Sequence, residues 1–302
     1  MGKVVLTNGI EIPDLCLGTG IVYGYGDGRR DPYHVAGHWV KSLFKNRKRL
    51  KSDYALPGVI NVAMTHSCSA FDTSRAYGGA EYVLGKTLKK YRRQDYFIVT
   101  KMCNADQFNG DTRAALEKSL RELDMEYVDL YLLHWPVTDT YITTWQKVER
   151  LYEEGLCKAI GVCNCNIHHL EEMKRLVNIM PMVNQFECHP LFTQDRLREY
   201  CHQNGIQVMA YTSTARMDER LSKTCLVPIT EKYQKSIAQI ILRWHQQIGN
   251  IPIVNSYNKN HFRENTEIYD FKLTEEEVAA ILNININSRL RYDPDNCDFR
   301  KL

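Results

Sequence analysis

Short apolar runs and amphipathic segments alternate along most of this chain, and this alternation restricts its possible folds more than any other feature. From residue 68 onward, each apolar run of four to seven residues precedes a segment whose apolar residues lie three and four positions apart, as at Leu116, Leu120 and Leu123. The first pattern indicates a buried strand, and the second indicates an amphipathic helix. The apolar runs do not alternate cleanly with polar residues, which is typical of parallel strands that helices cover on both faces.

Repeated strand–helix pairs predict an α/β fold, and eight strands predict a (β/α)8 TIM barrel. The expected strands are residues 15–20, 68–72, 96–100, 127–133, 157–162, 182–187, 207–211 and 251–254, and the expected helices are 80–91, 112–123, 144–155, 168–177, 195–205, 236–249, 262–270 and one capped at Thr274. Residues 4–13 predict an N-terminal β-hairpin with a type I′ turn at Asn8 and Gly9. Residues 22–57 follow neither pattern, so we expect a long insertion after the first barrel strand, with a short helix at 35–44. No second composition regime appears, and we expect a single domain over residues 1–302.

Composition excludes several classes of protein. The net charge of +3 gives no reason to expect binding to nucleic acid or to an anionic membrane, and no apolar run reaches the length of a membrane-spanning helix. The first residues lack the apolar core of a signal peptide. The ten cysteines are scattered, so reduced thiols are expected and not a disulfide framework. We therefore expect a cytoplasmic protein that is a monomer or a weak oligomer.

Polar residues follow three of the expected strands, where a parallel barrel brings its strand ends together. Asp72, Lys101 and His134 end or follow their strands, and Tyr77 comes shortly after Asp72. A tyrosine is a weak acid at neutral pH unless a nearby cation favours its phenolate, and Lys101 could supply that cation. Each residue alone would more often be a packing, solvated or ion-paired side chain. Together they suggest a group that protonates an oxygen on which negative charge develops.

The segments FDTSRAYGGAEYVLG, DLYLLHWP, NQFECHP and IPIVNSYNKNHFREN resemble those of the aldo-keto reductase superfamily in order and spacing, over nearly the whole chain except residues 22–57. The resemblance implies a barrel that binds NADPH, less often NADH, and reduces an aldehyde or ketone or runs in reverse on an alcohol. It implies that Tyr77 is the general acid, that Lys101 and Asp72 tune it, and that His134 orients the substrate carbonyl. Trp135, with Tyr23, is expected to line the substrate pocket.

The resemblance also implies a cofactor site. Cys163, Asn164 and Gln185 are expected at the nicotinamide carboxamide, although Cys163 replaces the usual serine and weakens one hydrogen bond. Tyr211 is expected to stack on the nicotinamide ring. The expected contacts to the adenosine end are Ser256, Asn258, Arg263 and Asn265. Lys259, His261 and Arg263 favour NADP, and NAD stays possible.

Other interpretations remain open at this stage. Cys163, Cys165, His168 and His169 suggest zinc, but their spacing differs from that of common zinc sites, and we expect no metal. The barrel could also be a cofactor-binding regulatory or non-catalytic subunit, since Cys163 and the insertion depart from the family pattern. An isomerase or hydrolase is a third, weaker alternative. The basic insertion could favour an anionic substrate, and the substrate itself is not identified, because pocket loops vary freely on this fold.

Overall fold

The computed structural model describes residues 2–20, 47–66 and 68–300. The strands are β1 Lys3–Val5, β2 Glu11–Pro13, β3 Cys16–Gly18, β4 Ala70–Asp72, β5 Phe97–Met102, β6 Leu130–Leu133, β7 Ile160–Cys163, β8 Val183–Glu187, β9 Gln207–Tyr211 and β10 Ile251–Asn255. The helices are α2 Arg47–Thr65, α3 Ala80–Leu88, α4 Asn104–Asn109, α5 Thr112–Leu123, α6 Tyr141–Glu153, α7 Ile167–Leu176, α8 Asp195–Gln203, α9 Leu226–Tyr233, α10 Ile237–Gln247, α11 Lys259–Thr266 and α12 Glu275–Leu282.

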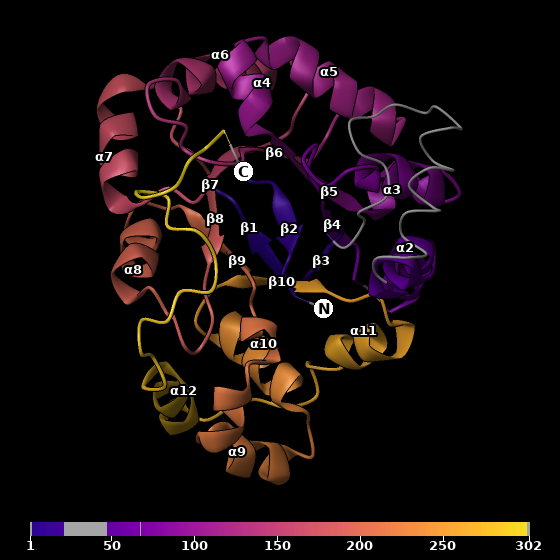
Figure 1. Cartoon of the computed structure of the whole chain (residues 1–302), viewed down its shortest axis with the longest axis vertical. Coiled ribbons are helices and arrows are strands. Elements are labelled where there is room, and N and C mark those ends of the chain that lie inside the picture. Colours follow the sequence, from indigo (N-terminus) through magenta and orange to yellow (C-terminus); the bar gives the residue numbers. More distant parts are fainter. Residues whose placement is uncertain (1, 21–46, 67, 301–302) are drawn as a thin grey trace.

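Eight parallel strands close into a barrel in the order β10-β3-β4-β5-β6-β7-β8-β9. The helices form a ring around it (Figure 1), which confirms the predicted fold class. The barrel strands are buried along nearly their whole length, because the helices cover their outer faces and side chains fill the interior. The single domain predicted for residues 1–302 stays a prediction, since that range includes residues outside the description.

The N-terminal hairpin forms as expected, but its predicted turn is wrong. Thr7 and Asn8 form the centre of a turn closed by a hydrogen bond from the Gly9 N–H to the Leu6 carbonyl, and of these residues only Gly9 has a positive φ, +83°. A type I′ turn would need a positive φ at both central residues, whereas a turn followed by a left-handed glycine forms a three-residue loop. The Asn8 side chain donates to the Lys158 carbonyl (2.9 Å), so the hairpin lies at the amino end of β7.

The predicted insertion ends too late in the sequence, because α2 begins at Arg47 and runs through Pro57 to Thr65. Adjacent Pro57 and Gly58 indicate a turn, which conceals the helix. The helix forms because Leu56, Val59, Ile60 and Ala63 share one face, and all four are buried. Two further helices, α4 and α9, were also not predicted. The short helix expected at residues 35–44 lies outside the described residues.

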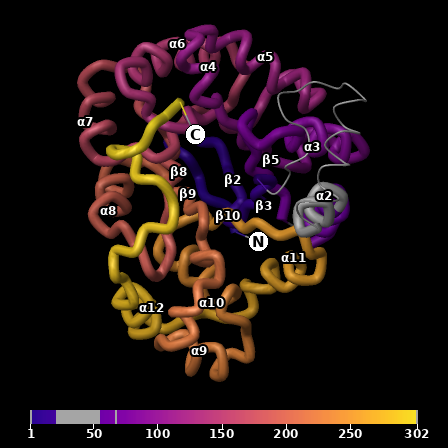
Figure 2. Tube along the Cα trace, in the orientation of Figure 1, coloured from indigo at the N-terminus to yellow at the C-terminus, as the bar shows by residue number. Residues whose placement is uncertain are grey.

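The segment after α12 crosses the carboxyl ends of the barrel strands, in front of the barrel in Figures 1 and 2. Its backbone and side chains contact the residues that follow those strands. The Asn104 side chain donates to the Phe299 carbonyl (3.0 Å), and the Phe299 ring lies 6.2 Å from the Trp135 ring. The Asn166 amide donates to Asp295 (2.7 Å). The C-terminal segment therefore forms part of the barrel mouth.

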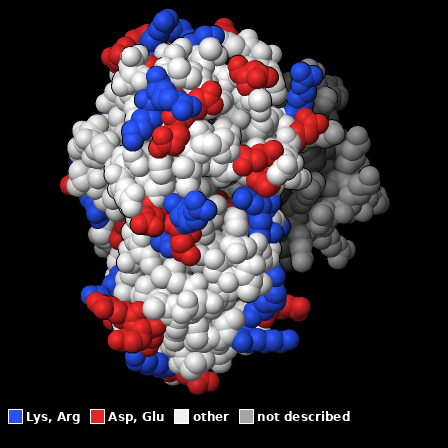
Figure 3. All heavy atoms as spheres, turned by 90° about the vertical axis from the view of Figure 1, so that its left-hand side faces the viewer, with Lys and Arg blue, Asp and Glu red and all other residues white. Residues whose placement is uncertain are grey.

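Charges are mixed on the face that includes α7 and α8, where Figure 3 shows Lys and Arg interspersed with Asp and Glu among the described atoms. None of the helices in the described part of the chain combines the length and the apolar character that a bilayer crossing requires. All ten cysteines are free thiols, as predicted.

Candidate active site

The carboxyl ends of β4, β5 and β6 bring together the four residues proposed for proton transfer. Asp72 ends β4, Lys101 lies near the end of β5, and His134 follows β6. Tyr77 lies in the loop after β4, and its ring lies 5.1 Å from the Lys101 Nζ and 5.7 Å from the His134 ring, which meets it edge-on. The barrel register places these ends side by side, because each strand pairs with the next in parallel.

Lys101 and Asp72 form a buried ion pair. The Lys101 Nζ donates to Asp72 Oδ2 at 2.6 Å and to the Thr73 carbonyl at 2.8 Å, and the Lys101 side chain is 0% exposed. Gln185 Nε2 donates to the same Asp72 oxygen at 2.8 Å. Burial lowers the pKa of Lys101, but the attraction of Asp72 outweighs it and leaves the pKa raised. The lysine is therefore a permanent ammonium at neutral pH.

Tyr77 is a partly buried phenol, and its removal from solvent raises its pKa to about 12 although the Lys101 charge acts in the opposite direction. The sequence predicts that Lys101 favours the phenolate of Tyr77, but removal from solvent dominates in the free site. Tyr77 consequently keeps its proton at neutral pH, as a general acid must. The adjacent ammonium would stabilise the phenolate left after proton transfer.

His134 is neutral, because burial, Lys101 and Arg291 lower its pKa to about 3. Its Nδ1 lies 3.2 Å from Ser74 Oγ, which already accepts the Ala76 N–H (3.1 Å). We assign the histidine proton to Nε2, since the Ser74 hydroxyl has its own proton left to donate to Nδ1. His134 can then donate a hydrogen bond, but it does not supply a proton as an imidazolium.

These groups open into a cavity of about 530 Å³ at the barrel mouth. Among the predicted residues, Asp72, Tyr77, His134, Trp135, Cys163, Asn164, Gln185 and Tyr211 line it. Gly20 lies against the Tyr77 ring, where an added Cβ would be 3.4 Å from Cε2. The other predicted pocket residue, Tyr23, lies outside the described residues.

The residues expected at a nicotinamide differ in how free their polar atoms are. Asn164 already makes two hydrogen bonds, because its Nδ2 donates to the His134 carbonyl (3.0 Å) and its Oδ1 accepts from the Tyr211 hydroxyl (2.7 Å), which leaves one N–H and one lone pair. Gln185 uses its Nε2 on Asp72, while no described residue donates to its Oε1. Burial raises the pKa of Cys163, so this residue faces the cavity as a neutral thiol. Gln185 Oε1 is thus an acceptor to which no described residue donates, and a carboxamide could donate to it.

The residues expected at the adenosine end lie together on a separate segment, between β10 and the end of α11. Asn258 caps α11, accepting the backbone N–H groups of Asn260 (2.9 Å) and His261 (3.4 Å). Ser256 Oγ accepts the Asn258 N–H at 3.1 Å. The helix begins at Lys259, before the expected start at residue 262, and the N–H groups of Asn260 and His261 are already paired with Asn258 and not free for a phosphate. Arg263 is exposed and Asn265 is partly exposed on the same helix.

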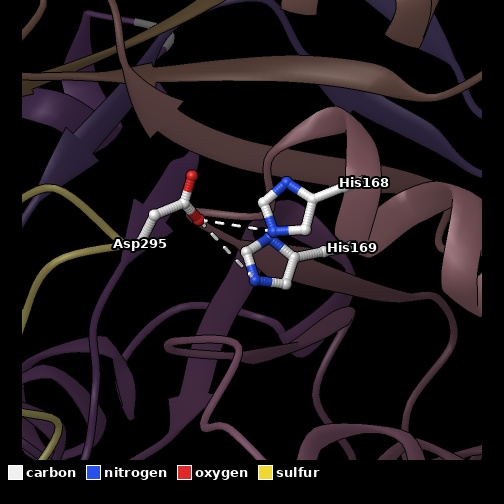
Figure 4. A group of neighbouring side chains, drawn as sticks. All are labelled: His168, His169 and Asp295. Atoms are coloured by element: carbon white, nitrogen blue, oxygen red, sulfur yellow. Dashed lines mark ion pairs between the residues drawn. The ribbon is translucent and has the colours of Figure 1, made fainter.

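The residues that suggested zinc are not gathered into one site. One group in the described part of the chain could hold a metal ion by proximity, and it consists of His168, His169 and Asp295 without either cysteine (Figure 4). His169 Nδ1 accepts the Asn166 N–H (3.1 Å), so the ring proton is on Nε2, the atom that faces Asp295 at 3.9 Å. A metal could bind Nε2 only if the ring proton moved to Nδ1, which would break this capping hydrogen bond. The hydrogen bonds of Asn166 with His169 and with Asp295 explain why these side chains lie close together.

Several residues line the cavity that were not predicted from the sequence to do so. They are Gly20, Ala76, Thr212, Ser213, Thr214, Arg216, Ile253, Asn255, Arg291 and Tyr292. Arg291 and Tyr292 come from the C-terminal segment, which has no helix or strand pattern to place it. Arg216 follows β9 in a short helical turn, with a φ of +54°. Ala76, Ile253 and Asn255 lie within segments that carry the family resemblance, although no role was expected for them. The location of the other residues depends on how loops fold over the barrel.

Comparison with known proteins agrees with this architecture. A sequence model of the Aldo/keto reductase family matches residues 37–218 and 216–286. An uncharacterized oxidoreductase, YtbE of Bacillus subtilis (strain 168), is 41% identical over 250 residues, covering 81% of this chain and 89% of that protein. The glyoxal reductase of the same organism is 41% identical over 241 residues, covering 80% and 87%.

The solved structure of a Bombyx mori aldo-keto reductase in complex with NADP matches with a TM-score of 0.81 at 29% identity. The match covers 97% of this chain and 96% of that one. The likeness in structure therefore extends over nearly the whole chain. The chain belongs to the aldo/keto reductase family.

Proposed function

We propose that this protein is an NADPH-dependent reductase that converts a small aldehyde or ketone to an alcohol, with Tyr77 as the proton donor. The observation that carries the proposal is the contact of Tyr77 with both Lys101 and His134 at the wall of the barrel-mouth cavity. This arrangement offers one protonated phenol, one buried cation and one neutral imidazole to a carbonyl oxygen. A regulatory barrel would have no need to preserve all three.

The proposed proton transfer follows from the charges of the site. A reduced nicotinamide bound in the cavity would supply the hydride that goes to the carbonyl carbon. His134 Nε2–H donates a hydrogen bond to the carbonyl oxygen and fixes its direction. Tyr77 then gives its proton to that oxygen as negative charge develops, and Lys101 stabilises the resulting phenolate. Asp72 keeps the ammonium charged and in place at 2.6 Å.

The cavity fits the nicotinamide end of such a cofactor. Gln185 Oε1 can accept a hydrogen bond from the carboxamide, and the Tyr211 ring lines the same wall. The preference for NADP is supported by three basic residues, Lys259, His261 and Arg263, on exposed positions of α11. The NADP bound by the Bombyx mori relative supports it as well.

The proposal is tested by following NADPH oxidation at 340 nm with glyoxal, methylglyoxal and an aromatic aldehyde, with NADH in parallel. Glyoxal is chosen because the Bacillus subtilis relative is a glyoxal reductase. We expect turnover by the wild-type protein and a kcat lower by about 10²- to 10⁴-fold in Tyr77→Phe, the usual contribution of a general acid. NADPH binding, measured by quenching of tryptophan fluorescence, should be unchanged in that variant.

Tyr91→Phe is the matched control, since the Tyr91 hydroxyl hydrogen-bonds to Asn61 (3.2 Å) and the residue does not line the cavity. Its kcat should equal that of the wild type. Tight NADPH binding without turnover of any carbonyl by the wild-type protein would refute the reductase and favour a regulatory subunit. Equal turnover by Tyr77→Phe and wild type would refute the role of Tyr77.

A further inference from the structure

The charges around the cavity are strongly one-sided. Among its described lining residues, the carboxylate is Asp72, and that group is already paired with Lys101. Two arginines, Arg216 and Arg291, line the same cavity from exposed positions. No carboxylate of the described residues lies within ion-pair distance of either guanidinium. The cavity thus presents unneutralised positive charge beside the groups proposed for proton transfer.

Arg291 lines the same cavity as Tyr77 and His134. Its positive charge acts on His134 and helps to keep the pKa of that residue low. A group bound by Arg291 would therefore lie near the carbonyl that His134 orients.

The backbone that carries Arg291 is anchored to the barrel by a buried glutamate. Glu187 ends β8 and is fully buried. Its two carboxylate oxygens accept the backbone N–H groups of Leu290 (2.7 Å) and Arg291 (3.0 Å), and His189 Nε2 lies 3.0 Å from the same carboxylate. This contact fixes where the C-terminal segment crosses the mouth. The backbone of Arg291 is therefore held in place, whereas its side chain forms no ion pair with a described residue.

Arg289, two residues earlier, has a different environment. Its guanidinium lies 3.9 Å from Asp293 and over the Phe192 ring at 4.6 Å, and Arg289 does not line the cavity. Arg289 thus makes a structural contact, whereas Arg291 on the same segment lines the cavity. This contrast provides a matched control on the same piece of chain.

We propose that Arg291, positioned by Glu187, binds a carboxylate on the substrate, so that the enzyme prefers carbonyl compounds that carry an anionic group. A planar guanidinium pairs with a carboxylate through two parallel hydrogen bonds. The cavity wall shields this pair from part of the solvent, which strengthens it relative to a surface ion pair. The proposal rests on the reductase function proposed above and specifies its substrate class.

The test compares 4-carboxybenzaldehyde with its neutral methyl ester, methyl 4-formylbenzoate, in wild type, Arg291→Met, Arg291→Lys and Arg289→Met. The quantity of interest is the ratio of kcat/KM for the acid to kcat/KM for the ester. Dividing the ratio of each variant by that of the wild type cancels the different intrinsic reactivity of the two aldehydes. Circular dichroism confirms that each variant is folded.

In Arg291→Met we expect this ratio to fall about 10- to 100-fold, as for the loss of a hydrogen bond between charged groups, with the ester little affected. Arg291→Lys should restore part of the ratio, because it keeps the charge but loses the paired geometry. Arg289→Met should leave the ratio unchanged.

An unchanged ratio in Arg291→Met, or an equal loss with both aldehydes, would overturn the proposal. So would a selective loss in Arg289→Met. These outcomes differ from failure of the reductase itself, in which the wild-type protein would reduce neither aldehyde.

Discussion

The buried pair of Lys101 and Asp72 gives the most direct test of the site's electrostatics. At 2.6 Å the two charges attract each other by about 6 kcal/mol if the effective dielectric constant is near 20. Most of that attraction compensates for removing the charges from water, so the pair adds little net stability. Removing one partner leaves the other charge buried and unpaired, which costs about 3–5 kcal/mol. We therefore expect Lys101→Met and Asp72→Asn each to be destabilised by that amount.

The double variant Asp72→Asn/Lys101→Met should lose less stability than either single variant, because it contains neither charge. The Thr73 carbonyl still loses its hydrogen bond from Lys101, which accounts for a residual loss of about 1 kcal/mol. The expected coupling energy between the two substitutions is thus at least about 5 kcal/mol. All variants should lack reductase activity, since the ammonium beside Tyr77 is lost or misplaced.

Unfolding in urea, followed by circular dichroism and by tryptophan fluorescence, measures these free energies if both probes give the same transition. Urea is preferred to guanidinium chloride because it does not screen charges. The matched control is the pair Lys89–Asp124, which has a similar N–O distance of 2.8 Å but is exposed. Its double-mutant cycle should show almost no coupling. Additive losses at Lys101 and Asp72, within about 0.5 kcal/mol, would refute the reasoning.

Two further predictions concern stability. Burial lowers the pKa of His245 to about 3, and the neutral ring bridges the Ser213 carbonyl and the Asn250 amide. The contribution of this neutral ring to the free energy of unfolding should be complete above the unfolded pKa near 6.5. That contribution should be lost as the pH falls toward 3. Between pH 6 and 4.5, urea unfolding of His245→Gln should accordingly show a pH slope smaller than that of the wild type by about 1.4 kcal/mol per pH unit, and equal slopes would contradict a buried neutral histidine. Gly85→Ala should destabilise the protein by about 1–3 kcal/mol, because the new Cβ would lie 2.1 Å from the Leu123 carbonyl oxygen on α5. Gly58→Ala on α2 is its control and should be neutral or stabilising in thermal unfolding, since the new methyl group meets only the flexible end of Lys259; similar losses in both variants would argue against the steric explanation.

The sequence was sufficient to predict the architecture and to place Tyr77 beside three residues at the strand ends. Parallel strands leave a periodic signal, and their carboxyl ends must converge once the barrel closes, so Asp72, Lys101 and His134 could be placed together from their positions alone. The helix α2 was not predicted, because adjacent Pro57 and Gly58 suggested a turn although a buried apolar face stabilises the helix. The prediction also failed at the Asn8–Gly9 turn, where only one residue adopts the left-handed conformation.

Tertiary structure decided the properties that depend on distance and burial. The pKa of Tyr77 follows from its burial as well as from its neighbour Lys101, and no sequence pattern gives the balance between the two. The two hydrogen bonds of the Asn164 amide, and the availability of Gln185 Oε1, depend on which side chains meet across the barrel. The position of Arg291 depends on a contact between Glu187 and a segment about one hundred residues away in sequence. Sequence periodicity reports which residues share a face of an element, whereas charge, protonation and free hydrogen-bonding capacity are set by the neighbours that only the folded chain supplies.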